Sequence, residues 1–232
     1  MNIDFYKILN HGVSITSSGT TGDPKTIFRT PHNLLACIRV SLEAQEISKK
    51  SKILTVTRMT HAGGLLAQSL PGYYIGCDLD IKVFNAYTFL KNFENYTHTF
   101  LTPQQMWAVT NTKNFNECDL TGKWVLGGSD PVSWDLIEKF VRRGAIVQPN
   151  WGMSEVGPIA INKIYKDTDQ ISEDKQKSVN GTVLGNKFWC DWKMINNVLW
   201  VKGDIVYQDD WLMTNDLVEQ IGDDMFYLGR NS

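Results

Sequence analysis

A run of hydroxyl side chains with two glycines and a lysine follows a short apolar segment near the start of the chain. It reads Ile15-Thr-Ser-Ser-Gly-Thr-Thr-Gly-Asp-Pro-Lys-Thr-Ile27. Glycines let the main chain bring its amides close to an anion, hydroxyls add further donors, and a lysine adds a positive charge. We therefore predict that this segment binds a polyphosphate. The predicted binding residues are Ser17, Ser18, Gly19, Thr20, Thr21, Gly22 and Lys25.

Other interpretations of the glycine-rich segments are weaker. Pro24 stands where the Walker A pattern G-x-x-x-x-G-K-S/T needs a second glycine after Gly19, which argues against a P-loop NTPase. A serine hydrolase would need a glycine two residues after Ser154, where Val156 stands. A surface turn without a ligand is the simplest alternative for the run of serines and threonines.

Further short segments follow the phosphate loop in a fixed order. They are Met59-Thr-His-Ala-Gly-Gly-Leu65, Leu126-Gly-Gly-Ser129, Asn150-Trp-Gly-Met-Ser-Glu155, Asn180-Gly-Thr-Val-Leu-Gly185, Met213-Thr-Asn-Asp-Leu217 and Tyr227-Leu-Gly-Arg230. Together with the loop, this series resembles the adenylate-forming superfamily, which includes acyl- and aryl-CoA synthetases, luciferases and peptide-synthetase adenylation domains. The layout, including the segment from Thr97 to Trp107, is most similar to the o-succinylbenzoate-CoA ligase branch. The resemblance covers nearly the whole chain but only the middle part of a family enzyme.

The resemblance implies which residues carry the chemistry. Activating a carboxylate requires ATP whose phosphate charge is neutralised. Glu155 matches the glutamate that helps to hold Mg²⁺, a hard cation that prefers oxygen ligands. Ser154 matches the hydroxyl residue on the α-phosphate, and Lys25 supplies positive charge to the phosphates. His61 matches the residue at the mouth of the acyl pocket.

The resemblance also implies the nucleotide contacts. Trp151 occupies the place of a tyrosine that packs on adenine, which keeps the stacking surface and loses the phenolic hydroxyl. Asp216 matches the aspartate that accepts hydrogen bonds from the ribose hydroxyls, and Arg230 matches the arginine that closes over the same sugar. Asn215 replaces a glycine, which asparagine tolerates if the backbone is left-handed there. The remaining predicted contacts are Gly127, Gly128 and Ser129 along the base, Asn150 at its amino edge, and Gly152.

The elements that must position these residues alternate along the first two thirds of the chain. Apolar segments typical of buried strands are followed by helical patterns, which predicts a mostly parallel sheet flanked by helices. Thr30 and Pro31 predict a helix start, and Gly144 follows a helix expected from about Val132 to Arg143. The strand candidates are Val13–Ser17, Lys52–Thr57, Asp80–Phe84, Thr97–Leu101, Lys123–Leu126 and Ala145–Gln148.

The pattern changes after Gly157. The stretch from Lys166 to Lys177 is polar, and later segments read as strands joined by short turns such as Asn196-Asn197. We therefore expect an α/β fold with residues 1–156 as the nucleotide- and acyl-binding core. Residues 157–232 are expected to form a smaller β-rich subdomain that completes the nucleotide site.

Composition excludes several classes of partner. A formal net charge of -2 and isolated basic doublets give no field that would recruit nucleic acid or a membrane. No apolar stretch is long enough for an export signal or a membrane span. The four cysteines are scattered without metal-ligand spacing, which favours a reduced, cytoplasmic protein.

The predicted function is ATP-dependent activation of a small or aromatic carboxylic acid to an acyl-adenylate. The acyl acceptor is left open between CoA, a carrier protein and water. The resemblance places a mobile domain with a catalytic lysine after the segment ending at Arg230, and a large portion before the phosphate loop. We therefore expect a homo-oligomer or a separately encoded C-terminal domain. The alternative is a nucleotide-binding module that keeps the ATP/AMP site but has lost or delegated catalysis.

Overall fold

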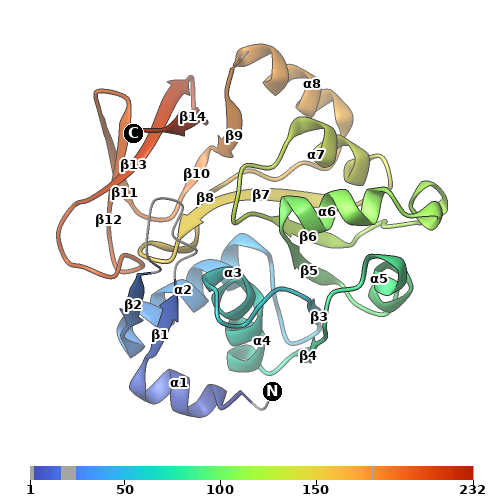
Figure 1. Ribbon diagram of the computed structural model, residues 1–232, viewed down its shortest axis with the longest axis horizontal. Helices are drawn as coiled ribbons and strands as arrows, with labels where there is room; N and C mark the ends of the chain where they lie inside the picture. Colours follow the sequence, from blue (N-terminus) through green and yellow to red (C-terminus); the bar gives the residue numbers. More distant parts are fainter. Residues whose placement is uncertain (1–2, 17–24, 179, 232) are drawn as a thin grey trace.

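A central sheet of seven strands organises the chain, whose structure is described for residues 3–16, 25–178 and 180–231. The strand order in this computed structural model is β10-β8-β7-β6-β5-β3-β4 (Figure 1). Strands β4, β3, β5, β6 and β7 pair in parallel, and β8 and β10 extend one edge in antiparallel fashion. The mostly parallel sheet is as predicted. Its strands are β3 (Lys52–Thr55), β4 (Asp78–Ile81), β5 (His98–Leu101), β6 (Trp124–Gly127), β7 (Ile146–Met153), β8 (Gly157–Asn162) and β10 (Lys187–Phe188).

Helices cover both faces of this sheet (Figure 1). Side chains alternate across a strand, so Val125 and Leu126 of β6 point to opposite faces. Val125 joins a core cluster with Phe93, Met106 and Phe140, whereas Leu126 joins a cluster that contains Ala67. The first face is covered by α5 (Ala86–Phe93), α6 (Pro103–Thr110) and α7 (Trp134–Val141), and the second by α2 (Pro31–Ala44), α3 (Ala62–Gly64), the π-helix η1 (Leu65–Ser69) and α4 (Leu70–Ile75).

Local signals fix where several helices begin. The Thr30 side chain accepts a hydrogen bond from the Asn33 amide at 3.2 Å, and Pro31 is the first helical residue of α2, as predicted. The helix predicted from about Val132 to Arg143 is shorter and begins after Ser133, whose side chain accepts from the Leu136 amide at 3.4 Å.

The strand predicted at Asp80–Phe84 is wrong in its second half. β4 ends at Ile81, and the apolar Val83 is 94% exposed, so it has no sheet face to pack on. Asn85 instead caps α5, because its side chain accepts from the amides of Tyr87 and Thr88. Apolar residues alone did not distinguish this loop from a strand. The remaining short elements are α1 (Phe5–His11), β1 (Val13–Thr16), β2 (Thr26–Arg29) and the 3-10 helix η2 (Lys113–Glu117).

A separate antiparallel sheet of five strands forms the β-rich part of the chain. Its order is β11-β12-β13-β14-β9. Asn196 and Asn197, with φ of 51° and 62°, form the tight turn between β11 and β12; a two-residue hairpin turn of type I′ needs positive φ at both residues, which asparagine tolerates. Strand β8 begins at Gly157, within the range expected for the β-rich subdomain, but it pairs into the seven-stranded sheet. The strands are β9 (Thr182–Gly185), β11 (Asp191–Ile195), β12 (Val198–Lys202), β13 (Leu212–Ile221) and β14 (Asp224–Arg230).

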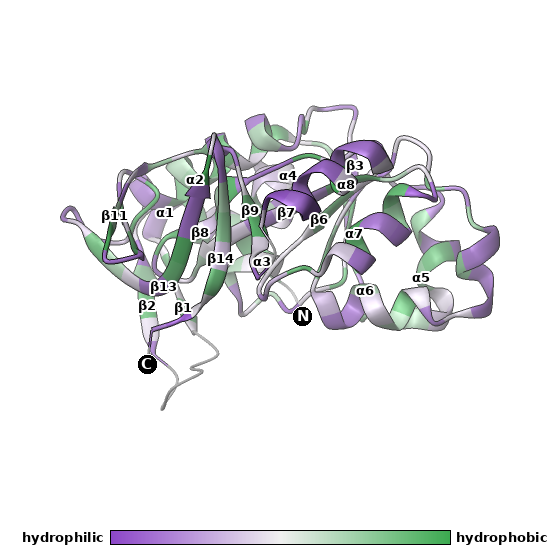
Figure 2. Cartoon of the chain, turned by 90° about the horizontal axis from the view of Figure 1, so that it is seen from above, coloured by the Kyte–Doolittle hydropathy of each residue, from purple (hydrophilic) through white to green (hydrophobic). Residues whose placement is uncertain are grey.

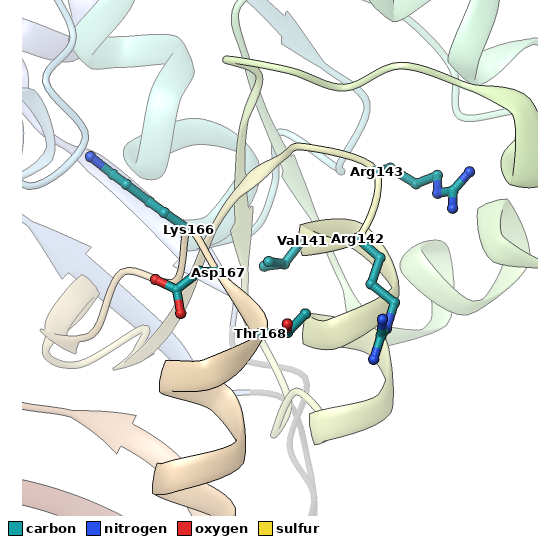
Figure 3. A pocket seen from close by; sticks show the side chains of 6 residues that line it. All are labelled: Val141, Arg142, Arg143, Lys166, Asp167 and Thr168. Carbon is teal, nitrogen blue, oxygen red and sulfur yellow. The ribbon is translucent and has the colours of Figure 1, made fainter.

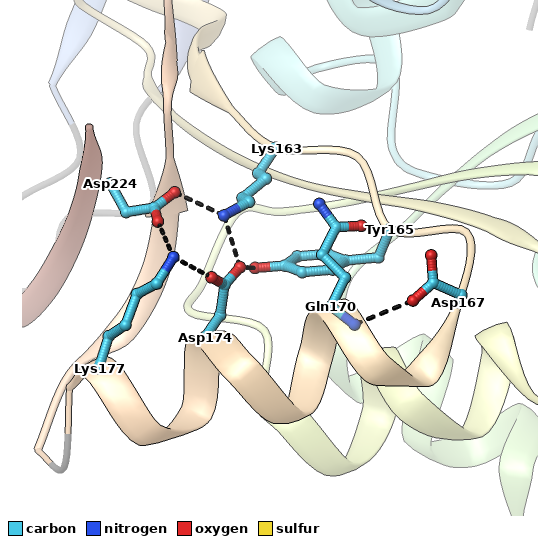
Figure 4. A network of polar contacts seen from close by, with 7 residues as sticks. All are labelled: Lys163, Tyr165, Asp167, Gln170, Asp174, Lys177 and Asp224. Carbon is cyan, nitrogen blue, oxygen red and sulfur yellow. Dashed lines mark hydrogen bonds and ion pairs between the residues drawn. The ribbon is translucent and has the colours of Figure 1, made fainter. Parts of the chain in front are cut away.

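A buried network of charges joins the two sheets through α8 (Thr168–Lys177) (Figure 4). Lys163 Nζ lies 2.5 Å from Asp174 Oδ2 and 2.5 Å from Asp224 Oδ1, and Lys177 Nζ lies 2.6 Å from the other oxygen of each carboxylate. The Tyr165 hydroxyl donates to Asp174 at 2.7 Å. Helix α8 is mostly hydrophilic (Figure 2), so ion pairs supply much of its attachment.

Burial acts to raise the pKa of Asp174, but hydrogen bonds from Lys163, Lys177 and Tyr165 outweigh it and hold that pKa below its usual value. In the described ranges, no helix has both the length and the apolar character that a membrane crossing requires.

Candidate active site

Three of the segments singled out in the sequence lie at one edge of the parallel sheet. Strands β3, β6 and β7 run in the same direction, so their carboxyl ends share an edge. The loop after β3 carries His61, β6 ends at Gly127, and β7 leads into Ser154 and Glu155. Ligands of open α/β sheets bind at this edge.

Gly128 lies directly against Asn150. A Cβ added to Gly128 would come within 2.5 Å of Asn150 Oδ1, so a larger residue would displace that side chain. The Asn150 amide nitrogen donates to the Pro158 carbonyl, while Oδ1 is buried and has no hydrogen-bond partner in the described part of the chain. Such an orphaned acceptor costs free energy until a donor reaches it. Asn150 is therefore suited to receive an N–H group of a ligand.

Ser129 and the loop that carries His61 are packed together. A Cβ added to Gly63 would lie 3.3 Å from Ser129 Oγ and 2.8 Å from the Phe100 ring. Ser129 has φ of 76°, a left-handed conformation that is uncommon for serine and frequent at functional sites. His61 is half-buried at the start of α3, two residues before Gly63. His61, the predicted acyl-pocket residue, is therefore only two positions from Gly63, which packs against Ser129 of the predicted adenine site.

Trp151, Asp216 and Arg230 form the tightest group among the predicted residues. The indole Nε1 of Trp151 donates to Asp216 Oδ2 at 2.8 Å, and Arg230 Nε lies 3.6 Å from Asp216 Oδ1. Trp151 and Asp216 are 7% and 5% exposed. Asn215, beside Asp216, has φ of 63°, which is the left-handed backbone expected where asparagine replaces glycine.

Burial dominates the electrostatics of Asp216. It raises the pKa of the carboxyl above its usual value, against the lowering effects of the Trp151 hydrogen bond and the Arg230 charge. The negative charge of Glu155 raises the same pKa further. A ligand that donates hydrogen bonds to Asp216 would stabilise its charged form.

The turn between β7 and β8 holds Ser154 and Glu155. Gly152 is packed so tightly across this hairpin that an added Cβ would lie 2.2 Å from the Gly157 carbonyl oxygen. The carbonyl oxygens of Ser154 and Glu155 both accept from the Arg29 guanidinium, at 3.3 and 3.0 Å. The main chain of the turn is therefore fixed, while both side chains are partly accessible.

Glu155 fits the role of a magnesium ligand by its chemistry. Within the described ranges, no three His, Cys, Asp or Glu side chains gather into a protein-only metal site. Mg²⁺ usually takes one or two carboxylates and completes its shell with phosphate oxygens and water. A single partly accessible carboxylate beside the predicted nucleotide site matches that requirement.

The hairpin of β1 and β2 flanks the predicted phosphate loop. Thr16 pairs with Thr26 in this hairpin, so the two ends of the loop are brought together. Lys25 is exposed immediately before β2. The other predicted phosphate contacts lie outside the described residues: Ser17, Ser18, Gly19, Thr20, Thr21 and Gly22.

A separate surface hollow lies between α7 and the start of α8 (Figure 3). The side chains of Arg142 and Arg143 point away from Lys166 there. Arg142 pairs with Glu138 at 2.6 Å, and Arg143 donates to the Asn116 carbonyl. The arginine and lysine side chains that line this hollow therefore do not converge on a common point.

Two buried polar residues near the turn were missed by the sequence analysis. Arg29 is fully buried and contacts main-chain carbonyls up to 176 positions away, and Asn33 donates to the carbonyls of Asp204 and Val206 at 2.9 and 3.0 Å. Main-chain acceptors leave no mark on residue type, so no sequence pattern points to these partners. The sequence gives one hint only: Arg29 falls on the inward-facing side of a strand whose residues alternate between exposed and buried.

The comparisons with known proteins show the family and the fold. A family model described as AMP-binding enzyme matches residues 13–214. The chain belongs to the AMP-binding enzyme family. The structure of a double mutant of o-succinylbenzoate CoA synthetase from Bacillus subtilis is similar, with a TM-score of 0.79 at 20% identity, over 94% of this chain and 48% of that one.

Two curated proteins of the family are similar in sequence. Acyl-CoA synthetase FUM10 of Gibberella moniliformis is 27% identical over 158 residues, which cover 63% of this chain and 27% of the synthetase. Indoleacetate–CoA ligase of Aromatoleum aromaticum is 30% identical over 148 residues, which cover 62% of this chain and 29% of the ligase. The chain thus matches less than a third of the length of these relatives.

Proposed function

We propose that this chain binds ATP and Mg²⁺ and activates a small or aromatic carboxylic acid as its acyl-adenylate. The contact of Trp151 with Asp216, beside Arg230, carries the proposal. It joins an aromatic ring, a hydrogen-bond acceptor and a cation from distant parts of the sequence, next to the Gly128–Asn150 contact. The names of the relatives, an acyl-CoA synthetase and an indoleacetate–CoA ligase, support a carboxylic acid as the substrate.

The nucleotide is bound in parts by different elements. The Asp216 carboxylate accepts hydrogen bonds from the ribose hydroxyls, and Arg230 closes over the sugar. The adenine lies between Trp151 and the Gly127–Ser129 segment, with its amino group donating to the orphaned Asn150 Oδ1. The triphosphate extends toward Lys25, Ser154 and the loop of residues 17–24.

The reaction joins the acid to the α-phosphate. A carboxylate oxygen of the acid attacks the α-phosphorus, the bond to the oxygen bridging the β-phosphate breaks, and its electron pair leaves with pyrophosphate. Lys25 and the Ser154 hydroxyl stabilise the charge that develops on the phosphate oxygens. Mg²⁺, held by Glu155 when bound, supplies neutralisation of the phosphates. In a second step the thiol of CoA or of a carrier protein, or a water molecule, attacks the acyl carbon, the bond from that carbon to the phosphate oxygen breaks, and AMP leaves.

Acid-dependent release of pyrophosphate tests the proposal. A panel of small and aromatic carboxylic acids is assayed with the wild-type chain, with Lys25→Ala and with Lys91→Ala, an exposed lysine of α5 that serves as the control. Loss of one electrostatic group should reduce the rate by roughly 10² to 10³ in Lys25→Ala only. Nucleotide binding without acid-dependent release would favour the alternative, a binding module. Absence of nucleotide binding would overturn both functions.

We further propose that the working unit contains a second copy or a separate C-terminal domain. Large aromatic side chains are exposed on α1, β2 and α4, with Tyr6 at 68%, Phe28 at 53% and Tyr74 at 52%. Exposed aromatic side chains are commonly covered in an assembly. Sedimentation that shows a stable monomer, with a rate unchanged by an added family C-terminal domain, would contradict this proposal.

A further inference from the structure

We infer that Arg29 is a positioning residue for the metal- and phosphate-binding turn at Ser154 and Glu155. This inference rests on the proposed function and names a residue through which two parts of that site hold their relative positions. Among the described residues, Arg29 makes no hydrogen bond to a predicted ligand-binding side chain. It acts through the main chain of the turn.

The contacts of the guanidinium define the inference. Nη1 donates to the carbonyl oxygens of Ser154 and Glu155 at 3.3 and 3.0 Å, and Nη2 donates to the Ile205 carbonyl at 2.5 Å. Nη2 also lies 3.2 Å from Cys37 Sγ. The side chain is 0% exposed. No ion pair between Arg29 and a carboxylate occurs in the described part of the chain.

A buried cation with such partners constrains its surroundings. Removing a guanidinium from water is unfavourable unless its donors are satisfied. Nη1 and Nη2 have acceptors, whereas the buried Nε has none in the described part of the chain. The oxygen acceptors are carbonyls of two separate segments, so these segments must stay in place for the charge to remain buried. The guanidinium is a rigid planar fork, so it fixes directions as well as distances, which the flexible ammonium of lysine does not.

The position of Arg29 in the chain makes the constraint relevant to the site. It is the last residue of β2, the strand that begins one residue after Lys25 and pairs with β1 around the phosphate loop. Its acceptors belong to the two residues proposed to contact the α-phosphate and Mg²⁺. One side chain therefore links the strand leaving the phosphate loop to the turn on the other side of the phosphates.

The neighbouring contacts strengthen this junction. The Glu155 carbonyl also accepts from the Tyr207 amide at 2.8 Å, and Asn33 donates to both Asp204 and Val206. The loop between β12 and β13 is thus held by α2, by the turn and by Arg29 at once. The Ser154–Glu155 turn is fixed on two sides, although neither of its side chains is needed for that.

The alternative is that Arg29 only stabilises the fold. Removing such a residue would lower stability but would leave the Mg²⁺ dependence of ATP binding unchanged in the molecules that remain folded. A positioning residue changes that dependence, because a displaced Glu155 carboxylate holds the cation less well. Loss of a partner that orients a metal ligand typically weakens metal affinity by roughly 10- to 100-fold.

The experiment measures ATP binding by calorimetry while the Mg²⁺ concentration is varied, at a temperature where circular dichroism shows each variant folded. The variants are Arg29→Lys, Glu155→Gln, the double variant, and Arg39→Lys, an exposed arginine of α2, as the control. We expect the Mg²⁺ concentration at half-saturation to rise by roughly tenfold in Arg29→Lys and to stay unchanged in Arg39→Lys. The double variant should resemble Glu155→Gln alone, because both changes remove one interaction.

An unchanged Mg²⁺ dependence in Arg29→Lys, or effects of Arg29→Lys and Glu155→Gln that add fully, would overturn the inference. Failure of the wild-type chain to bind ATP would instead refute the proposed function on which the inference rests. If Arg29→Lys does not fold, hydrogen exchange of the Tyr207 amide in the wild-type chain decides. Slower exchange with ATP and Mg²⁺ than with ATP and a chelator supports the inference, and equal exchange overturns it.

Discussion

The indole N–H of Trp151 donates a hydrogen bond of 2.8 Å to the carboxylate of Asp216, 65 positions further along the chain. An aromatic residue expected at the base and a carboxylate expected at the ribose are thereby coupled directly. A tyrosine in place of Trp151 would present its polar group elsewhere on the ring. Compared with a tyrosine at this position, Trp151 lacks the phenolic hydroxyl but gives Asp216 a hydrogen-bond donor from within the protein.

The pH dependence of nucleotide binding follows from the pKa of Asp216. Only the carboxylate accepts from both ribose hydroxyls, and burial raises the pKa of this group above 3.8. We expect AMP affinity to be full above the raised pKa and to fall as the pH drops through it, at a higher pH than an exposed aspartate would give. Calorimetry with AMP across a pH series measures this, and an affinity that is constant until the ordinary aspartate range would contradict it.

Replacing Trp151 by phenylalanine should keep the ring and lose the donor. A hydrogen bond to a charged group contributes about 1.5 to 3 kcal/mol, so the stability of the folded chain, measured by chemical denaturation, should fall by about that amount. The pKa of Asp216 should also rise, because the Trp151 hydrogen bond lowers it. The pH profile of binding would then move to higher pH. Trp107→Phe, at a 62% exposed position of α6, should change neither quantity.

The close approach of Gly128 to Asn150 predicts a paired result. Gly128→Ala should weaken nucleotide binding, because the new methyl group would lie 2.5 Å from Asn150 Oδ1 and push that side chain away. In an Asn150→Ala background the same change should add little, since the obstructing side chain is gone. Binding assays on the single and double variants measure the coupling. Independent, additive losses would show that the two residues do not act together.

The left-handed backbone at Asn215 gives a stability prediction. With φ of 63°, glycine should be accepted there at little cost, whereas alanine should lower stability by about 1 to 2 kcal/mol. Chemical denaturation of Asn215→Gly and Asn215→Ala measures the difference. Equal stabilities for the two variants would mean that this backbone conformation is not maintained in solution.

Asp174 should contribute to stability in a pH-dependent way. Its folded pKa is lowered, so its contribution is fully present above the usual value of 3.8 and is lost as the pH falls through the lower folded value. Asp174→Asn leaves Lys163 and Lys177 without one partner each and should cost about 3 to 5 kcal/mol near neutral pH. Asp135→Asn, which removes an exposed pair with Lys139, should cost about 0 to 1 kcal/mol. Chemical denaturation of both variants at pH 7 and pH 3 measures these differences. Equal losses of stability in the two variants would contradict the prediction for Asp174.

Sequence reasoning succeeded where local chemistry decides the conformation. The Thr30-Pro31 start of α2 and the Asn196-Asn197 turn each depend on one or two residues and their own backbone, and the φ of 63° at Asn215 meets the condition under which asparagine tolerates a glycine position. The parallel sheet followed from the alternation of periodic patterns. The local features depend on contacts that are short in sequence, and the periodic patterns lie within single segments, which is why both can be predicted without a structure.

The parts that sequence reasoning missed depend on distant partners. Val83 has a residue type that is typical of strands, but in the folded chain it has no sheet face to pack on and is exposed. In the sequence, Arg29 looks like a surface arginine. The fold brings its acceptors around it, and these are main-chain oxygens and a thiol. The pairing of Trp151 with Asp216 also requires two sheets to meet.

The contacts of Arg29 also limit how this protein can be dissected. A cut after Val156 would separate the strand that bears the guanidinium from the Ile205 carbonyl oxygen that it holds at 2.5 Å. The amino-terminal fragment would then carry a cation inside its interior with one of its acceptors missing, and the other fragment would carry an unclaimed carbonyl. Fragments for spectroscopy or for split reporters should therefore be designed to keep both sides of this junction in one polypeptide.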